Sequence, residues 1–169
     1  MSSWFGLLAR LITGGVWLVA GALKFADPAG AVRAVRAYEL LPESVVPLVG
    51  HALPAVEMVI GLALILGIFT RWAAVLSGLL FLAFIIGIAS AWSRGLQIDC
   101  GCFGGGGFDA KATDKYPWEI ARDVALLALS LYLVVRPRSA LSLDGFLNLQ
   151  GPAGPATEGR STRAQSVQP

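Results

Sequence analysis

Four long runs of apolar residues, separated by shorter polar stretches, organise this 169-residue chain. Each run is close to the ~20 residues that an α-helix needs to cross the hydrocarbon core of a bilayer. The pattern therefore predicts four membrane-spanning helices that pack as one bundle. They cover residues 6–25, 45–69, 72–92 and 118–135. In the last run only residues 124–135 are unbroken, so Arg122 and Asp123 are expected at or just under the membrane interface.

Two further segments lie outside these runs. Residues 29–44 mix apolar and charged side chains and end near Pro42, which predicts a short helix lying in the membrane interface. Beyond Val135, Gly, Pro, Ser, Thr, Gln and Arg dominate, so residues 136–169 are predicted to form a disordered polar tail. The four-helix transmembrane domain is accordingly assigned to residues 1–135. Ala20-Gly21-Ala22 could pass for a signal-peptide cleavage site, but no positive charge precedes Arg10, which favours a retained first helix.

Composition supports a membrane protein. Hydrophobic residues make up 56% of the chain and charged residues 14%, and the mean hydropathy is +0.68. Soluble domains are typically about 45–50% apolar and about 25% charged. The net charge of +2 is too small, and its basic residues are too scattered, for a nucleic-acid-binding face. Lys and Arg are divided evenly between the two sets of loops, so the positive-inside rule leaves the orientation open.

The chain has two cysteines, Cys100 and Cys102, in the sequence IDCGCFGGGGF between the third and fourth runs. Two residues of extended chain span at most roughly 7 Å, and disulfides accept Cα separations of about 4.4–6.8 Å, so the pair could bond to itself. Such a small, strained ring suits thiol-disulfide exchange better than structural crosslinking. Gly101 and the glycines at 104–107 would give the loop freedom and let a partner approach.

Two other interpretations of the cysteines stay open: inert reduced thiols, and a metal site. A metal would need further ligands, and His51 is the only histidine. His51 is expected on the same side of the membrane as the cysteine loop, where it could be a ligand, a base or only a polar end group.

Charged residues in or near the apolar runs provide further candidates. Glu57 lies well inside the second run, where a carboxylate costs a few kcal/mol and usually faces the bundle interior or a partner. It could exchange the proton that accompanies thiol oxidation, or lock the bundle by pairing with Lys24 or Arg122. Arg122 could lower a cysteine pKa, or extend to the interface without any such role.

Several segments together resemble a known family. They are residues 20–24 (AGALK) with Asp27-Pro28, 36–42 (RAYELLP), 53–57 (LPAVE) with Gly61, 94–104 (RGLQIDCGCFG) and 120–122 (IAR). These segments resemble the MauE branch of the DoxX-like redox-associated membrane proteins, over roughly residues 5 to 135. The CGCFG motif after the third helix is the most specific of them.

The resemblance implies a four-helix protein of the bacterial cytoplasmic membrane. Methylamine-utilisation members are associated with maturation of a disulfide-rich periplasmic dehydrogenase subunit, alongside a thioredoxin-like partner, and DoxX-like relatives are linked to quinone-coupled oxidation. By the same resemblance, Cys100 and Cys102 match the family's cysteine pair, and Glu57 and Arg122 match its acidic and basic positions. Asp123 stands where the resemblance leads us to expect an amide.

These observations lead to the hypothesis of a membrane thiol-disulfide oxidoreductase. It would relay electrons between a thioredoxin-like partner and a membrane carrier such as a quinone, with no covalently bound cofactor, and so support disulfide formation or maturation of exported proteins. Because disulfides persist outside the cytoplasm, the CGC loop is expected there, with both termini inside. The alternative is a non-enzymatic subunit or assembly scaffold with a structural or metal-binding CGC loop; a solute transporter is less favoured. Homo-oligomerisation stays open.

Overall fold

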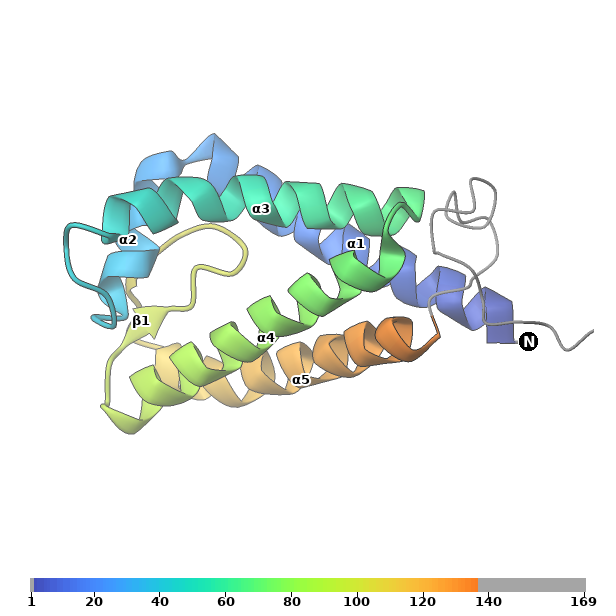
Figure 1. Cartoon of the computed structure of the whole chain (residues 1–169). Helices are drawn as coiled ribbons and strands as arrows, with labels where there is room; N and C mark the ends of the chain where they lie inside the picture. The colour runs from blue at the N-terminus through green and yellow to red at the C-terminus, as the bar shows by residue number, and fades with distance from the viewer. Residues whose placement is uncertain (1, 137–169) are drawn as a thin grey trace, which may run out of the picture.

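The computed structural model describes residues 2–136, which form an elongated and almost wholly helical bundle (Figure 1). The helices are α1 (Ser2–Ala26), α2 (Pro28–Ala37), α3 (Val46–Leu66), α4 (Thr70–Ser93) and α5 (Ala112–Val135). Between α4 and α5, the two-residue strands β1 (Ile98–Asp99) and β2 (Gly107–Phe108) pair antiparallel, with Ile98 opposite Phe108. The tail predicted to be disordered lies, from residue 137 onward, outside the described residues.

Three of these helices are long and apolar enough to cross a membrane. They are residues 4–26, 46–66 and 70–93, with hydropathies of 1.6, 1.9 and 2.4. Their outward faces carry exposed large apolar side chains such as Leu48, Val59 and Trp72, which are about 70% exposed. Apolar surface of this extent is consistent with a protein that sits in lipid. Helix α5 is not among the three, and its role as a fourth span stays a prediction.

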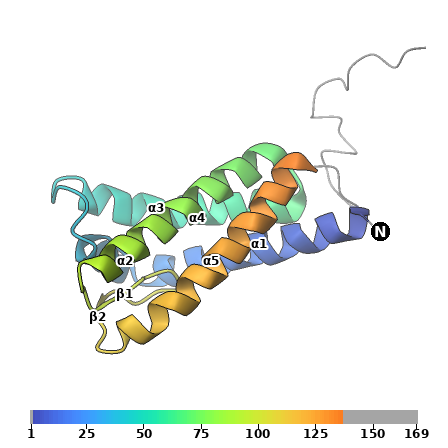
Figure 2. The same ribbon diagram turned by 90° about the horizontal axis from the view of Figure 1, so that it is seen from below.

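The four long helices pack as two pairs, α1 with α3 and α4 with α5 (Figure 2). Glycines bring the first pair close together. A Cβ atom built on Gly61 would lie 2.8 Å from the carbonyl oxygen of Gly14, and one on Gly14 would lie 2.9 Å from that of Gly61. Small residues at such a crossing let the backbones approach in lipid, where van der Waals packing drives helix association.

A buried aromatic and polar cluster joins the two pairs. Trp17 of α1 stacks on Phe81 of α4, with ring centroids 4.4 Å apart. Its indole N–H donates to Ser77 Oγ at 2.7 Å, and Ser77 and Ser130 of α5 share a hydrogen bond at 2.9 Å. Because buried polar groups are costly without partners, this chain of hydrogen bonds fixes α1, α4 and α5 relative to one another.

The ends of α3 and α2 differ from the sequence prediction for local reasons. Helix α3 stops at Leu66, not at Phe69, because Gly67 takes a left-handed conformation (φ 68°) that ends the helix. Helix α2 starts at Pro28, where Asp27 accepts a hydrogen bond from Gly30 N at 2.8 Å. It ends at Ala37, five residues before Pro42.

Helix α5 begins at Ala112, six residues before the predicted start, and Pro117 lies inside it. Pro117 is the sixth residue of the helix and has no backbone N–H, so one helical hydrogen bond is missing at this point. Tyr116 holds this first part in place, because its one hydroxyl hydrogen lies between Leu96 O at 2.7 Å and Ile98 O at 3.1 Å, and its oxygen accepts from Ile98 N at 3.2 Å. Contacts to the preceding loop therefore extend the helix beyond its apolar run.

Candidate functional site

Both cysteines lie in the loop between α4 and α5, at the end of the bundle where α2 also lies (Figure 1). They are free thiols and are buried, with exposed fractions of 8% for Cys100 and 6% for Cys102. The backbone N–H of Cys102 donates to Cys100 Sγ at 3.3 Å. Gly101, between them, has φ 65°, and its N–H donates to Asp99 Oδ1 at 2.8 Å. The loop thus holds the two thiols together without a covalent bond.

Helix α2 forms one wall of the cysteine loop. A Cβ atom on Gly101 would lie 2.5 Å from Ala34 Cβ, and one on Gly106 would lie 2.8 Å from the same atom and from Gly30 O. These distances exclude a side chain at either glycine unless the loop moves away from α2. The short helix predicted from residues 29–44 therefore buries one face against the thiol loop and α3.

Two tyrosines anchor the loop from opposite sides. Tyr38, just after α2, donates its hydroxyl hydrogen to Cys100 O at 3.0 Å, and Tyr116 of α5 bonds the backbone of Leu96 and Ile98. Burial, and next the two cysteines nearby, raise the pKa of Tyr38, so its hydroxyl stays protonated and able to donate. Each tyrosine restricts the backbone conformation of a loop that its glycines would otherwise leave flexible.

The first cysteine is held in its protonated form. A hydrogen bond with the side chain of Cys102, then burial, raise the pKa of the Cys100 thiol well above its usual range, although the backbone N–H of Cys102 acts in the opposite direction. A thiol with a raised pKa is a weak nucleophile at neutral pH, because the thiolate is the reactive form. Cys100 is therefore protected until the loop opens or a base takes its proton.

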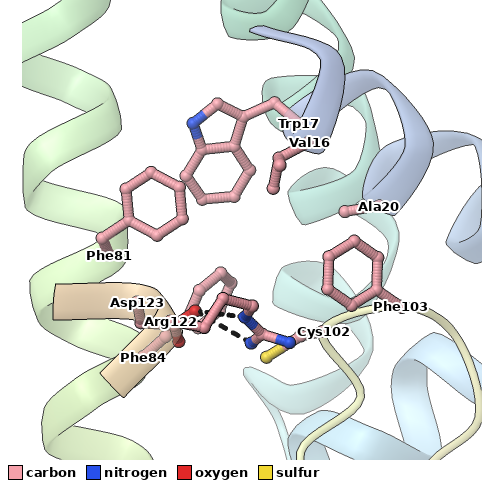
Figure 3. Close-up of a pocket in the computed structure, with 9 residues that line it drawn as sticks. All are labelled: Val16, Trp17, Ala20, Phe81, Phe84, Cys102, Phe103, Arg122 and Asp123. Carbon is pink, nitrogen blue, oxygen red and sulfur yellow. Dashed lines mark hydrogen bonds and ion pairs between the residues drawn. The ribbon is translucent and has the colours of Figure 1, made fainter. Parts of the chain in front are cut away.

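Cys102 lines a small pocket that lies inside the bundle, between α1, α4, α5 and the loop (Figure 3). Its walls are mostly aromatic and aliphatic, and its charged residues come from the middle of α5. The lining residues are Val16, Trp17, Ala20, Phe81, Phe84, Cys102, Phe103, Arg122 and Asp123. The free volume is about 10 Å³, which is close to the room that one water molecule needs. A larger guest requires the side chains to move apart.

Arg122 lies in this pocket and pairs with its neighbour in sequence. Its guanidinium contacts Asp123 Oδ1 at 2.9 Å from Nε and 2.8 Å from Nη2, and lies 4.9 Å from the ring centre of Phe103. Adjacent helical residues do not ordinarily face each other, so the arginine side chain folds back over Asp123. Figure 3 shows the same guanidinium pointing toward the sulfur of Cys102.

Glu57 lies elsewhere, in a buried ion pair. Its Oε1 is 2.5 Å from Lys24 Nζ of α1, and the two side chains are 0% and 4% exposed. Lys24 also lies 5.5 Å from the ring centre of Phe84, which is part of the pocket wall. Of the four sequence-predicted site residues, the structure brings Cys100, Cys102 and Arg122 together. It places Glu57 beside Lys24, behind that wall.

Other residues of this end of the bundle were not identified from the sequence. Asp123 was noted only as a departure from an expected amide, Tyr38 only as part of the RAYELLP segment that carries the resemblance, and Tyr116 not at all. His51 is exposed on α3, with Nδ1 2.6 Å from Pro47 O, and is absent from the pocket lining. Within residues 2–136, no group of three or more His, Cys, Asp or Glu side chains could hold a metal ion.

Comparison with known families gives one match, which covers most of the chain. Residues 2–136 match the family described as methylamine utilisation protein MauE. Comparisons with curated proteins and with solved structures gave no match. The matched residues coincide with the part of the chain that the structure describes, and they include the helices, the CGC loop and the pocket. The chain belongs to the MauE family.

Proposed function

We propose that this MauE family member is a four-span thiol-disulfide redox protein of the bacterial cytoplasmic membrane. Its Cys100–Cys102 pair would exchange electrons with a thioredoxin-like partner on one side and with a quinone in the membrane on the other. The observation that carries the proposal is the position of Cys102, which lies next to Cys100 at the loop end of the bundle and also lines a pocket between the helices. Family membership supports a role in methylamine utilisation.

The fourth span in this proposal is α5. It has 24 residues, or about 36 Å at 1.5 Å per residue, and packs along α4 for much of its length (Figure 2). Its charged residues lie in its first half, near the cysteine loop, where they would meet the interface. With four spans, residues 2 and 136 are on one side of the membrane and the thiols on the other. Disulfide chemistry favours the outside for the thiols.

The chemistry of the pocket fits a quinone ring. Four aromatic side chains, those of Trp17, Phe81, Phe84 and Phe103, offer faces for stacking. Arg122 offers N–H donors that a carbonyl oxygen would accept. The free volume of about 10 Å³ means that the ring would enter only when side chains separate; Phe103, on the glycine-rich loop and 39% exposed, is the wall residue best placed to move. When bound, a quinone supplies a two-electron acceptor.

A thiol titration tests the proposal. The full chain, in membranes, is equilibrated across a graded thiol buffer, trapped with a maleimide reagent and weighed by mass spectrometry. A reversible loss of both labels together, at a potential between those of known exchange proteins, is the expected result. A Cys100→Ser/Cys102→Ser variant gives the blank, because the chain has no other cysteine.

A second measurement distinguishes an electron relay from a scaffold protein. A short-chain water-soluble quinone added to the reduced protein, without thiol buffer, should oxidise the cysteine pair. Thiols that stay reduced throughout would overturn the relay and favour a structural role for the CGC loop. A reporter fused after Pro169 tests the orientation, and an extracytoplasmic reporter would contradict the proposed cytoplasmic position of the C-terminus.

A further inference from the structure

Asp123 is the most deeply buried charged residue of the pocket. Its exposed fraction is 1%, and it lies on α5 beside Arg122 (Figure 3). Both arginine contacts fall on Oδ1. The other oxygen, Oδ2, is buried and has no hydrogen-bond partner among the residues that the structure describes. A buried polar atom without a partner costs free energy, so its retention in the same pocket as a thiol calls for an explanation.

The charged and titratable groups around Asp123 come from several elements. Arg122 contributes a positive charge from α5 and Glu119 a negative one from the same helix, and Lys24 of α1 also acts on Asp123 through its charge. The loop contributes Cys102, while α4 presents the rings of Phe81 and Phe84 to the pocket. Glu57 of α3 reaches this region only through Lys24. Of the α5 carboxyl groups Asp123 and Glu119, the first lines the pocket with Cys102, whereas the second hydrogen-bonds with Cys100.

We propose that Asp123 is the proton-exchanging residue of the pocket, passing a proton between the Cys102 thiol and a carbonyl oxygen of the quinone. This inference rests on the proposed function and assigns it a residue that the cysteine motif does not reveal. Arg122 is the positioning partner: by occupying Oδ1, it leaves Oδ2 for the proton. The role requires a carboxyl group at this position, since an amide cannot accept and release a proton in this way.

The proposed step balances as follows. Asp123 accepts the proton of the Cys102 thiol, which makes a thiolate. As the S–S bond to Cys100 forms, the electron pair passes to the quinone, and Asp123 donates its proton to the nearer carbonyl oxygen. The Cys100 proton leaves to water, and the farther oxygen takes a proton from water. Two S–H bonds break, one S–S bond forms, and the quinone becomes a hydroquinone; the reverse reaction uses the same groups.

The test compares two oxidants on reduced full-length protein in detergent or lipid. One is the short-chain quinone, and the other is a small disulfide, glutathione disulfide, which needs Asp123 only to accept the Cys102 proton and not to donate it again. Asp123→Asn should therefore slow oxidation by the quinone at least tenfold more than it slows oxidation by the disulfide. Asp123→Glu should recover part of the quinone rate. Asp114→Asn, exposed in the first turn of α5, is the matched control.

Three results would overturn the inference. An unchanged quinone rate in Asp123→Asn means that the carboxyl takes no part. An equal loss of rate with both oxidants means that Asp123 is only structural. The same holds if Asp123→Glu does not restore the quinone rate and the midpoint potential of the Cys100–Cys102 pair shifts. If the wild-type thiols react with the disulfide but never with the quinone, the proposed function fails first, and the inference fails with it. Thermal unfolding followed by the fluorescence of the five tryptophans reports whether each variant stays folded.

Discussion

The buried Lys24–Glu57 ion pair allows a sharp prediction about what holds α1 against α3. Its atoms are 2.5 Å apart, and the two side chains are 4% and 0% exposed. Removing one partner of such a pair leaves a charge in an apolar interior, which typically costs about 3–5 kcal/mol. We therefore expect Glu57→Gln and Lys24→Met each to destabilise the protein strongly, whereas Lys24→Met/Glu57→Leu removes both charges and should cost far less than the sum.

Proton transfer limits both penalties. The orphaned glutamate of Lys24→Met can escape by taking a proton, which costs about 3.7 kcal/mol at pH 7, and the orphaned lysine of Glu57→Gln can escape by losing one, which costs about 4.6 kcal/mol. The cost of protonating the glutamate falls by about 1.36 kcal/mol for each unit that the pH is lowered. The cost of deprotonating the lysine falls by the same amount for each unit that the pH is raised. The contact of Lys24 with Phe84 at 5.5 Å would offset part of the Glu57→Gln penalty, by about 0.5–2 kcal/mol.

Thermal unfolding in detergent, followed by Trp fluorescence at pH 6, 7 and 8, measures these effects. At roughly 3 °C per kcal/mol for a chain of this size, each single variant should melt up to about 10 °C below wild type. Lys24→Met should regain up to about 4 °C at pH 6, and Glu57→Gln up to about 4 °C at pH 8, because the cost of each proton transfer falls by about 1.36 kcal/mol over that pH unit. Single variants that melt within 3 °C of wild type, penalties that add in the double variant, or pH trends of the same sign would refute the reasoning.

Three smaller changes test the cysteine loop. Gly101→Ala should lose about 1–2 kcal/mol of stability from its left-handed φ alone, and more from the clash with Ala34. Gly95→Ala, with φ 69° and no neighbouring atom within 4 Å, should lose only the first amount. Equal melting temperatures for the two variants would contradict the contact between Gly101 and α2. Tyr38→Phe removes the donor to Cys100 O, so we expect a loss of about 0.5–1.5 kcal/mol and faster maleimide labelling of both thiols, with unchanged labelling counting against the anchor. Because the pKa of Cys100 is raised, its thiol stays protonated at neutral pH, and its alkylation by iodoacetamide should still be accelerating at pH 10. A free cysteine, with an ordinary pKa of about 8.5, is almost fully ionised there, so mass spectrometry that shows the Cys100 rate levelling off by pH 10 would contradict this.

The apolar runs predicted the helices well, because burial in lipid or in a bundle imposes long stretches of apolar residues. They did not predict the start of α5, where Asp114 and Lys115 interrupt the hydropathy and Tyr116 supplies tertiary hydrogen bonds that no periodicity reveals. They also gave no sign of the β1–β2 pair. Two-residue strands are too short to show an alternating pattern, and this pair depends on glycines whose backbone angles only the fold determines.

The candidate site shows the same division. The cysteine pair stands out in the sequence because nothing else in the chain carries a thiol. The partner of Glu57 was left open between Lys24 and Arg122, since the choice depends on how α1 is placed along α3. The close approach of Gly14 and Gly61 fixes that placement and brings Lys24 to Glu57. Asp123 could not be assigned to the pocket, because its contact with Arg122 depends on a side chain folding back along its own helix.

Phe84 connects the stability of the bundle with the chemistry of its pocket. Its ring contacts Lys24 of the buried ion pair, and the same ring lines the pocket with Cys102 and Asp123. A charge left unpaired at Lys24 or Glu57 would therefore lie one aromatic ring away from the thiol. A redox defect in a Glu57 variant does not by itself make Glu57 a proton donor, because loss of the pair would disturb this wall. Lys24→Met/Glu57→Leu decides between the roles: if it restores both the melting temperature and the rate of thiol oxidation, Glu57 acts by holding the bundle together, whereas a restored melting temperature with slow oxidation would give the carboxyl a part in the chemistry.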